Sequence, residues 1–214
     1  MLSKSQQGNN RRFVPMVGSS VAFVTLAIFV YCGGTNAWDR AVFLEAAAHQ
    51  DHHLDLAAQF FSWFASGWAL LAISVGATMA HPVVRKWRHV TASVVVAVAG
   101  GELIIGFVKH VIQRPRPLAS ADHLGYAFPS GHAFFTVVVY GLLSSLLCSS
   151  RRTLGFALSV VAAGCILIGA SRIYLGVHYV SDVLGGFLLA IPWLYSCVAL
   201  ATRLNIKNLR SGPR

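Results

Sequence analysis

Residues 90–109 read VTASVVVAVAGGELIIGFVK, an apolar run that is interrupted by one acid, Glu102, and ended by Lys109. An α-helix needs about 20 mainly apolar residues to cross the hydrocarbon core of a bilayer, so this stretch predicts a spanning helix. Of the 214 residues in the chain, 56% are hydrophobic and 11% are charged. A soluble domain carries about 25% charged residues. The composition therefore indicates an integral membrane protein and excludes both a soluble globular fold and disorder.

Five further apolar runs lie along the chain. No repeat or polar linker separates them, so we expect one domain, residues 1–214, of the all-α class with six transmembrane helices in one bundle. The helices are expected near residues 13–32, 56–80, 90–108, 131–149, 153–171 and 181–202. The first run is longer than the core of a secretory signal, which favours an uncleaved span; cleavage would leave five spans. Between the first two runs, residues 40–53 are expected to form a short interfacial helix.

The basic residues predict the orientation of the bundle. With the N-terminus in the cytoplasm, the inner segments contain no acid and these basic residues: Lys4, Arg11, Arg12, Arg85, Lys86, Arg88, Arg151, Arg152, Arg203, Lys207, Arg210 and Arg214. Lys and Arg are enriched in cytoplasmic segments, so we expect a multi-pass protein of a bacterial cytoplasmic (inner) membrane with both termini inside. This topology explains most of the formal net charge of +10. Nucleic acid is not an expected partner, because the basic residues sit between apolar runs.

Two outer segments, residues 109–132 and 171–182, hold cations where the topology predicts few. Lys109, Arg116 and Arg172 supply fixed positive charge and donors suited to phosphate. Ser130 adds a hydroxyl group, and Gly131 lets a backbone N–H approach an anion closely. These residue types point to an oxyanion site at the outer membrane face.

The same segments contain two imidazoles and a carboxylate. His178 and Asp182 are four residues apart, so on a helix they share a face. A carboxylate in that position can hold the imidazole in one tautomer and strengthen it as a base or nucleophile. His132 offers a second imidazole that can give a proton to a leaving oxygen.

Three sequence blocks, in this order, resemble a known family. Lys-x6-Arg-Pro fits Lys109 to Arg116-Pro117, Pro-Ser-Gly-His fits residues 129–132, and Ser-Arg-x5-His-x3-Asp fits residues 171–182. Together they resemble the type 2 phosphatidic acid phosphatase superfamily, which also includes soluble vanadium haloperoxidases. The resemblance extends over about residues 102–193, and no motif position departs from the pattern.

The resemblance implies a role for each motif residue. His178 would attack phosphorus and form a phosphohistidine, and Asp182 would orient it. His132 would protonate the leaving oxygen and then activate water. Lys109, Arg116, Ser130, Gly131 and Arg172 would bind the phosphoryl oxygens. The cations would stabilise the transition state, so the resemblance implies neither a metal nor another cofactor.

A phosphate site at the membrane surface suits a lipid phosphate whose tail stays in the bilayer. We expect a phosphatase acting on a lipid phosphate or diphosphate, with undecaprenyl diphosphate ranked first and phosphatidylglycerol phosphate, phosphatidate and lipid A after it. A lipid phosphotransferase using the same phosphohistidine is the first alternative. A non-catalytic membrane transporter or scaffold is the second.

The sequence does not decide the roles of two other charged residues, Arg114 and Glu102. Arg114 lies beside the cationic cluster but outside the motif spacing, so it is a possible substrate contact. Glu102 lies two helical turns before Lys109, and an acid within a span is a functional candidate by default. We interpret it as either a hydrogen-bonding group inside the bundle or a support for the site.

A polar cluster and an aromatic cluster between residues 49 and 68 can each be explained by a position at the membrane surface. His49, Asp51, His52 and His53 have spacings that suit a metal, although a polar interfacial segment explains them better. The aromatic residues form an interfacial belt or line a path for an acyl chain: Phe60, Phe61, Trp63, Phe64 and Trp68.

Overall fold

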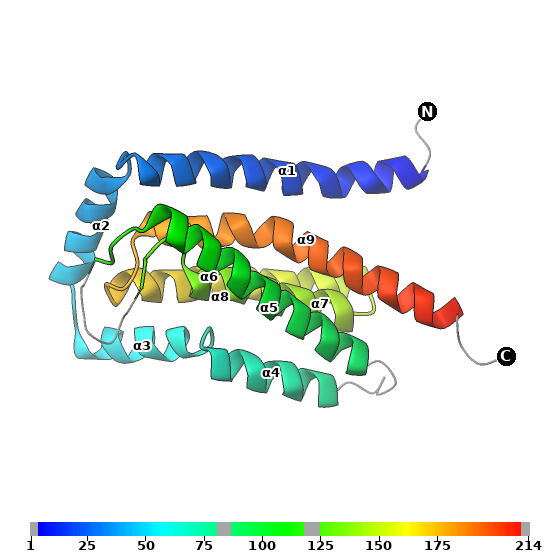
Figure 1. Ribbon diagram of the computed structural model, residues 1–214. Helices are drawn as coiled ribbons and strands as arrows, with labels where there is room; N and C mark the ends of the chain where they lie inside the picture. Colours follow the sequence, from blue (N-terminus) through cyan, green and yellow to red (C-terminus); the bar gives the residue numbers. More distant parts are fainter. Residues whose placement is uncertain (1–3, 81–86, 118–124, 211–214) are drawn as a thin grey trace.

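The computed structural model describes residues 4–80, 87–117 and 125–210, and within these ranges every regular element is helical (Figure 1). The expected all-α class is confirmed. In chain order the elements are α1 (Lys4–Tyr31), α2 (Asn36–Ala48), α3 (His52–Trp63), α4 (Gly67–Ala80), α5 (Trp87–Ile112), α6 (Gly131–Phe135), the π-helical turn η2 (Thr136–Tyr140), α7 (Gly141–Leu147), α8 (Arg151–Tyr174) and α9 (Val180–Arg210).

Four described helices are long and apolar enough to span a membrane: Phe13–Tyr31, His89–Ile112, Arg151–Tyr174 and Val180–Arg203. A fifth span results if α3 and α4 are counted as one broken helix. The helix from Gly131 to Leu147 is apolar but shorter. The protein is therefore a multi-pass membrane protein, and helix length alone gives four or five spans where the sequence predicted six.

The run at 56–80, expected to be one span, is two helices that meet at an angle of 54°. The chain leaves helical geometry between Phe64 and Ser66, and Gly67 begins α4. A helix break frees backbone carbonyls that need partners. Here the Tyr140 hydroxyl on η2 donates to the carbonyl oxygen of Phe64 at 2.6 Å. The break is thus held in place by the helix that follows the motif at 129–132.

The outer surface of the bundle is apolar. Trp68 is 81% exposed and Phe156 is 74% exposed, and many other large apolar side chains are uncovered. So much apolar surface on a folded chain indicates contact with lipid rather than water.

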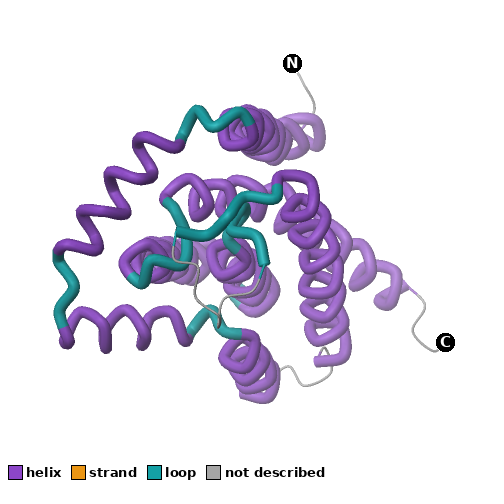
Figure 2. Tube along the Cα trace, turned by 60° about the vertical axis from the view of Figure 1, so that its left-hand side comes forward, coloured by secondary structure: helices purple, strands orange, loops and turns teal. Residues whose placement is uncertain are grey.

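Helix α2 lies across one end of the bundle and joins α1 to α3 (Figures 1 and 2). It covers Asn36–Ala48, close to the short interfacial helix expected at 40–53. The start of α1 and the end of α9 both lie at the opposite end of the bundle (Figure 1). Of the basic residues used to predict orientation, Arg85, Lys86 and Arg214 lie outside the described residues.

The core lies between α5, α9 and the helix formed by α6, η2 and α7. Ala97, Phe134, Val138, Leu142 and Ala190 are completely buried there. Helix α1 packs mainly on α9, and Phe23 of α1 stacks on Phe128 with ring centroids 5.9 Å apart. This packing holds the segment before α6 against the start of α9.

Gly186 sets how closely α9 approaches α6. A Cβ atom at this position would lie 2.5 Å from the Ser130 carbonyl oxygen and 2.9 Å from the Cβ of Ala133. The first of these atoms belongs to the backbone, so the helices would have to move apart. Small residues allow this kind of close approach between membrane helices.

We expect Gly186→Ala to lower the stability of the protein by about 1–3 kcal/mol, as overpacking does, and to reduce activity by displacing Ser130. Thermal unfolding in detergent measures the first effect. Gly164→Ala on α8 is the matched control, because no atom lies within 4 Å of its added Cβ. Equal unfolding temperatures for the two variants would contradict the close-packing explanation.

Candidate active site

The three motif segments converge at the end of the bundle where α2 lies. One follows α5, one precedes α6, and one connects α8 to α9. Backbone hydrogen bonds join them: Ala127 N–H donates to the Arg114 carbonyl at 2.8 Å, and Ser130 N–H donates to the Asp182 carbonyl at 2.9 Å. The structure therefore brings together residues that lie up to 73 positions apart between Lys109 and Asp182.

His178 is almost completely enclosed, with 3% of its surface exposed. Its Nδ1 lies 3.6 Å from Oδ2 of Asp182, slightly beyond hydrogen-bond range. Its Nε2 lies 3.4 Å from a guanidinium nitrogen of Arg116. Since guanidinium only donates, Nε2 is the ring nitrogen that carries the lone pair and accepts this contact, and Nδ1–H faces the carboxylate.

Burial lowers the pKa of His178 to about 4, and the nearby Arg116 and Arg172 act in the same direction, while Asp182 opposes them. The imidazole is therefore neutral at pH 7. A neutral ring keeps its lone pair available, which is the state that a nucleophile requires.

Asp182 is held by the backbone as well as by side chains. Its Oδ2 accepts a hydrogen bond from Tyr179 N–H at 2.8 Å, and its Oδ1 accepts one from Arg114 at 2.8 Å. The residue is fully buried in the first turn of α9. Its carboxylate therefore has little freedom to move relative to His178.

Arg116 is oriented before any substrate binds. It donates to the carbonyls of Val177 at 3.0 Å and Gly125 at 3.2 Å. Burial lowers the pKa of Arg116, and the charge of Asp182 opposes that shift. An arginine side chain nevertheless stays charged at neutral pH.

Arg172 is buried at the end of α8, where it donates to the Ser62 hydroxyl of α3 at 2.5 Å. Its Nε is also buried, and within the described structure it has no hydrogen-bond partner. A buried donor without a partner is uncommon and needs an explanation. A phosphoryl oxygen is the kind of acceptor that would satisfy it.

His132 lies between two cavities. The first, of about 520 Å³, extends between α4, α5 and α6, and Lys109, Gly131 and Glu102 line it with His132 and mainly apolar side chains. The second, of about 390 Å³, is lined by His132 and Arg172 together with polar residues of α3. Lys109, Arg116, Arg172 and His178 all lie close enough to His132 to act on its charge.

Ser130 precedes α6 and is completely buried. Its hydroxyl oxygen accepts a hydrogen bond from Ala133 N–H at 3.5 Å, which makes it the N-cap of the helix. Gly131 begins the helix, and a Cβ added to it would meet no atom within 4 Å. The backbone beside His132 is therefore open to a bound group.

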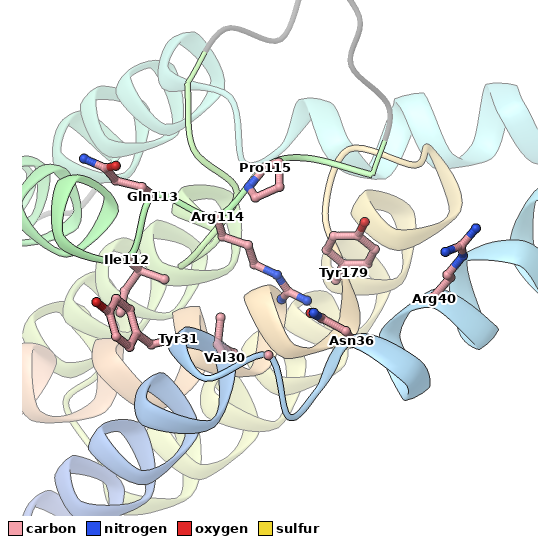
Figure 3. Close-up of a pocket in the computed structure, with 10 residues that line it drawn as sticks. Val30, Tyr31, Asn36, Arg40, Ile112, Gln113, Arg114, Pro115 and Tyr179 are labelled. Carbon is pink, nitrogen blue, oxygen red and sulfur yellow. The ribbon is translucent and has the colours of Figure 1, made fainter.

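Arg114 is buried to the same extent as Arg172, and its donors are directed at other groups of the protein. It contacts Asp182 and Ser181 through one nitrogen, and Asp39 at 2.7 Å and Thr35 at 3.5 Å through the other. Figure 3 shows it extending from the segment after α5 toward α2, with Tyr179 beside it. The Tyr179 ring centroid is 4.3 Å from the guanidinium carbon. These contacts favour a structural role over direct contact with a substrate.

Sequence reasoning missed Asp39, Ser62 and Ser181. Asp39 and Ser62 lie before every motif, and nothing in their local sequence sets them apart from other polar residues near a membrane surface. Ser181 lies beside Asp182 within the third motif and is buried. Of the three residues, it is the one whose burial a helical projection of the motif could have predicted.

The polar cluster at 49–53 contacts its own helices and α8, where the Tyr174 hydroxyl accepts from Asp51 N–H at 2.9 Å. Asp51 caps α3 by accepting from His53 N–H at 2.8 Å, and His49 lies 3.5 Å from Glu45. Among the residues that the structure describes, no three His, Cys, Asp or Glu side chains are placed to hold a metal ion together.

The part of the chain that contains the three motifs is similar to known proteins. The PAP2 superfamily profile matches residues 90–206. The chain is 38% identical to phosphatidylglycerophosphatase B of Bacillus subtilis strain 168 over 92 residues, which are 39% of this chain and 44% of that protein. It is 33% identical to an undecaprenyl-diphosphatase of Sulfolobus acidocaldarius over 110 residues, which are 48% of each.

A crystal structure of a transmembrane PAP2 type phosphatidylglycerolphosphate phosphatase from Bacillus subtilis has the same fold. Its TM-score is 0.78 at 24% identity, and the match covers 90% of this chain and 96% of that one. The chain spans about half the length of the curated relatives it matches. Because the family profile covers more than half of this chain, including all three motifs, the chain belongs to the PAP2 superfamily.

Proposed function

We propose that this protein is a membrane lipid phosphatase that hydrolyses a lipid phosphate or diphosphate through a phosphohistidine on His178. One observation carries the proposal: a buried imidazole whose Nδ1 faces Asp182 and whose Nε2 faces Arg116, at 3.6 and 3.4 Å. This is the arrangement that an activated nitrogen nucleophile needs beside a phosphate site.

In the first step, the Nε2 lone pair of His178 attacks phosphorus. The N–P bond forms while the bond from phosphorus to the leaving oxygen breaks, and His132 gives its proton to that oxygen. Asp182 stabilises the positive charge that develops on the ring of His178. The lipid product leaves as an alcohol or, from a diphosphate, as a monophosphate.

In the second step, water attacks the phosphohistidine. His132, now neutral, removes a proton from the water, the N–P bond breaks, and the electron pair returns to Nε2. Inorganic phosphate leaves, and His132 again carries a proton. Each group is restored, so no external oxidant or reductant is needed.

The cations act on the charge of the transferring group. Phosphoryl transfer relies mainly on positioning and on positive charge around the equatorial oxygens. Arg116 is already oriented by the Val177 carbonyl, and Arg172 offers a buried Nε without a partner among the described residues. Lys109, Ser130 and Gly131 complete the proposed binding set around His132.

The 520 Å³ cavity suits the part of the lipid next to the phosphate, because it runs from Lys109 and His132 into apolar side chains of α4 and α5. We propose six spans, both termini in the cytoplasm and an outward-facing site. Basic residues near the start of α1 and the end of α9, at the end of the bundle away from the site, support this orientation (Figure 1).

Undecaprenyl diphosphate is the substrate that we rank first, followed by phosphatidylglycerol phosphate and phosphatidate. The relatives include enzymes named for the first two lipids. An apolar cavity accepts an isoprenoid or an acyl chain equally well, so a direct assay must set the order.

The purified protein is expected to release phosphate from at least one of these three lipids in detergent with EDTA present. His178→Ala should lose this activity by a factor of about 10³ or more, since the nucleophile is absent. Release by this variant at the wild-type rate would refute the mechanism. Phosphorylated acceptor lipid in place of free phosphate would instead identify a phosphotransferase.

The acid limb of kcat/KM should lie well below the pKa of an ordinary histidine. Protonation removes the lone pair of His178, whose pKa is about 4, so activity should persist to about pH 5 and fall below it. The pH dependence of kcat/KM should be measured with both a phosphomonoester and a diphosphate. A limb that comes from ionisation of the substrate differs between the two substrates, whereas a limb that comes from His178 does not. An enzyme limb centred near 6.5 would contradict the proposed environment.

Glu102→Gln tests whether the acid in α5 supports the site. Glu102 and Lys109 line one cavity, and the charge of Glu102 acts on Lys109. Its loss should raise KM by a factor of about 3–10, because a carboxylate near Lys109 restrains that side chain. Unchanged kcat and KM would reject this role.

A further inference from the structure

Asp39 is an acid buried far from the motifs in sequence. It lies in α2 and has 1% of its surface exposed, although α2 lies at the end of the bundle. It also precedes residues 90–206, the part of the chain that matches the family. A buried carboxylate is costly unless it is paired and hydrogen-bonded, so its partners show what it does.

Among the described residues, the Asp39 side chain bonds to Arg114 and Ser181, which both adjoin Asp182. Its Oδ2 lies 2.7 Å from Arg114 and accepts from the Ser181 hydroxyl at 2.5 Å. Its Oδ1 accepts from Ser181 N–H at 3.0 Å. Asp39 thereby satisfies a free N–H in the first turn of α9, one residue before Asp182.

Arg114 continues the connection to the catalytic pair. It donates to Oδ1 of Asp182 at 2.8 Å, while the Oδ2 atom faces His178. One guanidinium thus lies between two buried carboxylates, with the Ser181 hydroxyl bridging Arg114 and Asp39. The planar donors of arginine suit such a shared site, whereas lysine would not.

We propose that Asp39 is a positioning residue for Asp182, acting through Arg114 and Ser181. The inference rests on the proposed function. The group of Asp39, Arg114 and Asp182 carries one net negative charge. Without the charge on Asp39, Arg114 pairs with Asp182 alone, and less negative potential remains at Nδ1 of His178. The nucleophile is then weaker, and the first turn of α9 is less firmly held.

This role predicts a selective kinetic effect. Asp39→Asn keeps the shape of the side chain and an acceptor for Ser181 N–H, but removes the charge. We expect kcat to fall about tenfold or more, as small misplacements of a catalytic group do. KM and the inhibition constant of inorganic phosphate should stay within about twofold, because Lys109, Arg116 and Arg172 are not altered. Loss of kcat alone is not what general loosening of the fold would give.

Two further variants sharpen the test. Glu45→Gln is the matched control, an acid of the same helix whose side chain is 76% exposed, and it should behave as wild type. Arg114→Gln leaves two buried carboxylates without their cation, and adding Asp39→Asn to it restores one net negative charge. The double variant should therefore be at least as active as Arg114→Gln, so that the two changes are not additive.

The outcomes separate the two proposals. A wild-type protein that releases no phosphate from any lipid overturns the proposed function and this inference with it. An active wild type whose folded Asp39→Asn variant keeps its kcat overturns the inference alone. If Asp39→Asn does not fold, Ser181→Ala decides: it removes only the bridging hydroxyl, and a kcat equal to wild type would overturn the positioning role.

Discussion

The arrangement of the candidate site depends on one buried guanidinium shared by two carboxylates. Arg114 comes from the segment after α5, Asp39 from α2 and Asp182 from the first turn of α9. A buried charge is tolerated only when its partners have good geometry and its remaining donors are satisfied, so the three segments are constrained together. The backbone bond from Ser130 to Asp182 adds the segment before α6. Four separate parts of the chain are thus fixed around the carboxylate that faces His178.

The same surroundings explain how the proposed nucleophile, His178, can lie beside the proposed phosphate site. Burial together with Arg116 and Arg172 keeps His178 neutral, although Asp182 favours its charged form. The same cations attract a phosphate, but without one they disfavour a second positive charge on His132. In the proposed mechanism, a bound phosphoryl group would supply the opposite charge and so let His132 hold the proton that it transfers. The proposed site therefore has an excess of donors that a bound phosphoryl group would satisfy, and the Arg172 Nε, which has no partner among the described residues, is one of them.

The sequence predicted the helices and the motif residues for different physical reasons. Long apolar runs such as 90–108 can only be helical in a bilayer, because every backbone group must be satisfied internally. The motif residues were recognised from fixed spacings. The break between Phe64 and Ser66 was not predicted, because the Phe64 carbonyl is satisfied by the hydroxyl of Tyr140. A contact between residues so far apart in the chain leaves no local signal in the sequence. Asp39 was missed for the same reason: nothing near it in the sequence shows that it is buried against Arg114.

The part of the chain that carries the motifs is not self-sufficient. Arg172 donates to Ser62 of α3, and Arg114 pairs with Asp39 of α2, and both partners precede the family-matched residues 90–206. Without them, Arg114 and Arg172 would each lose a buried acceptor, and leaving such a donor unsatisfied costs about 1–3 kcal/mol or more for a charged group. Helices α2 and α3 therefore do more than cover the bundle. They hold Arg114 and Arg172, so sequence changes in these helices can alter the proposed site while every motif residue stays the same.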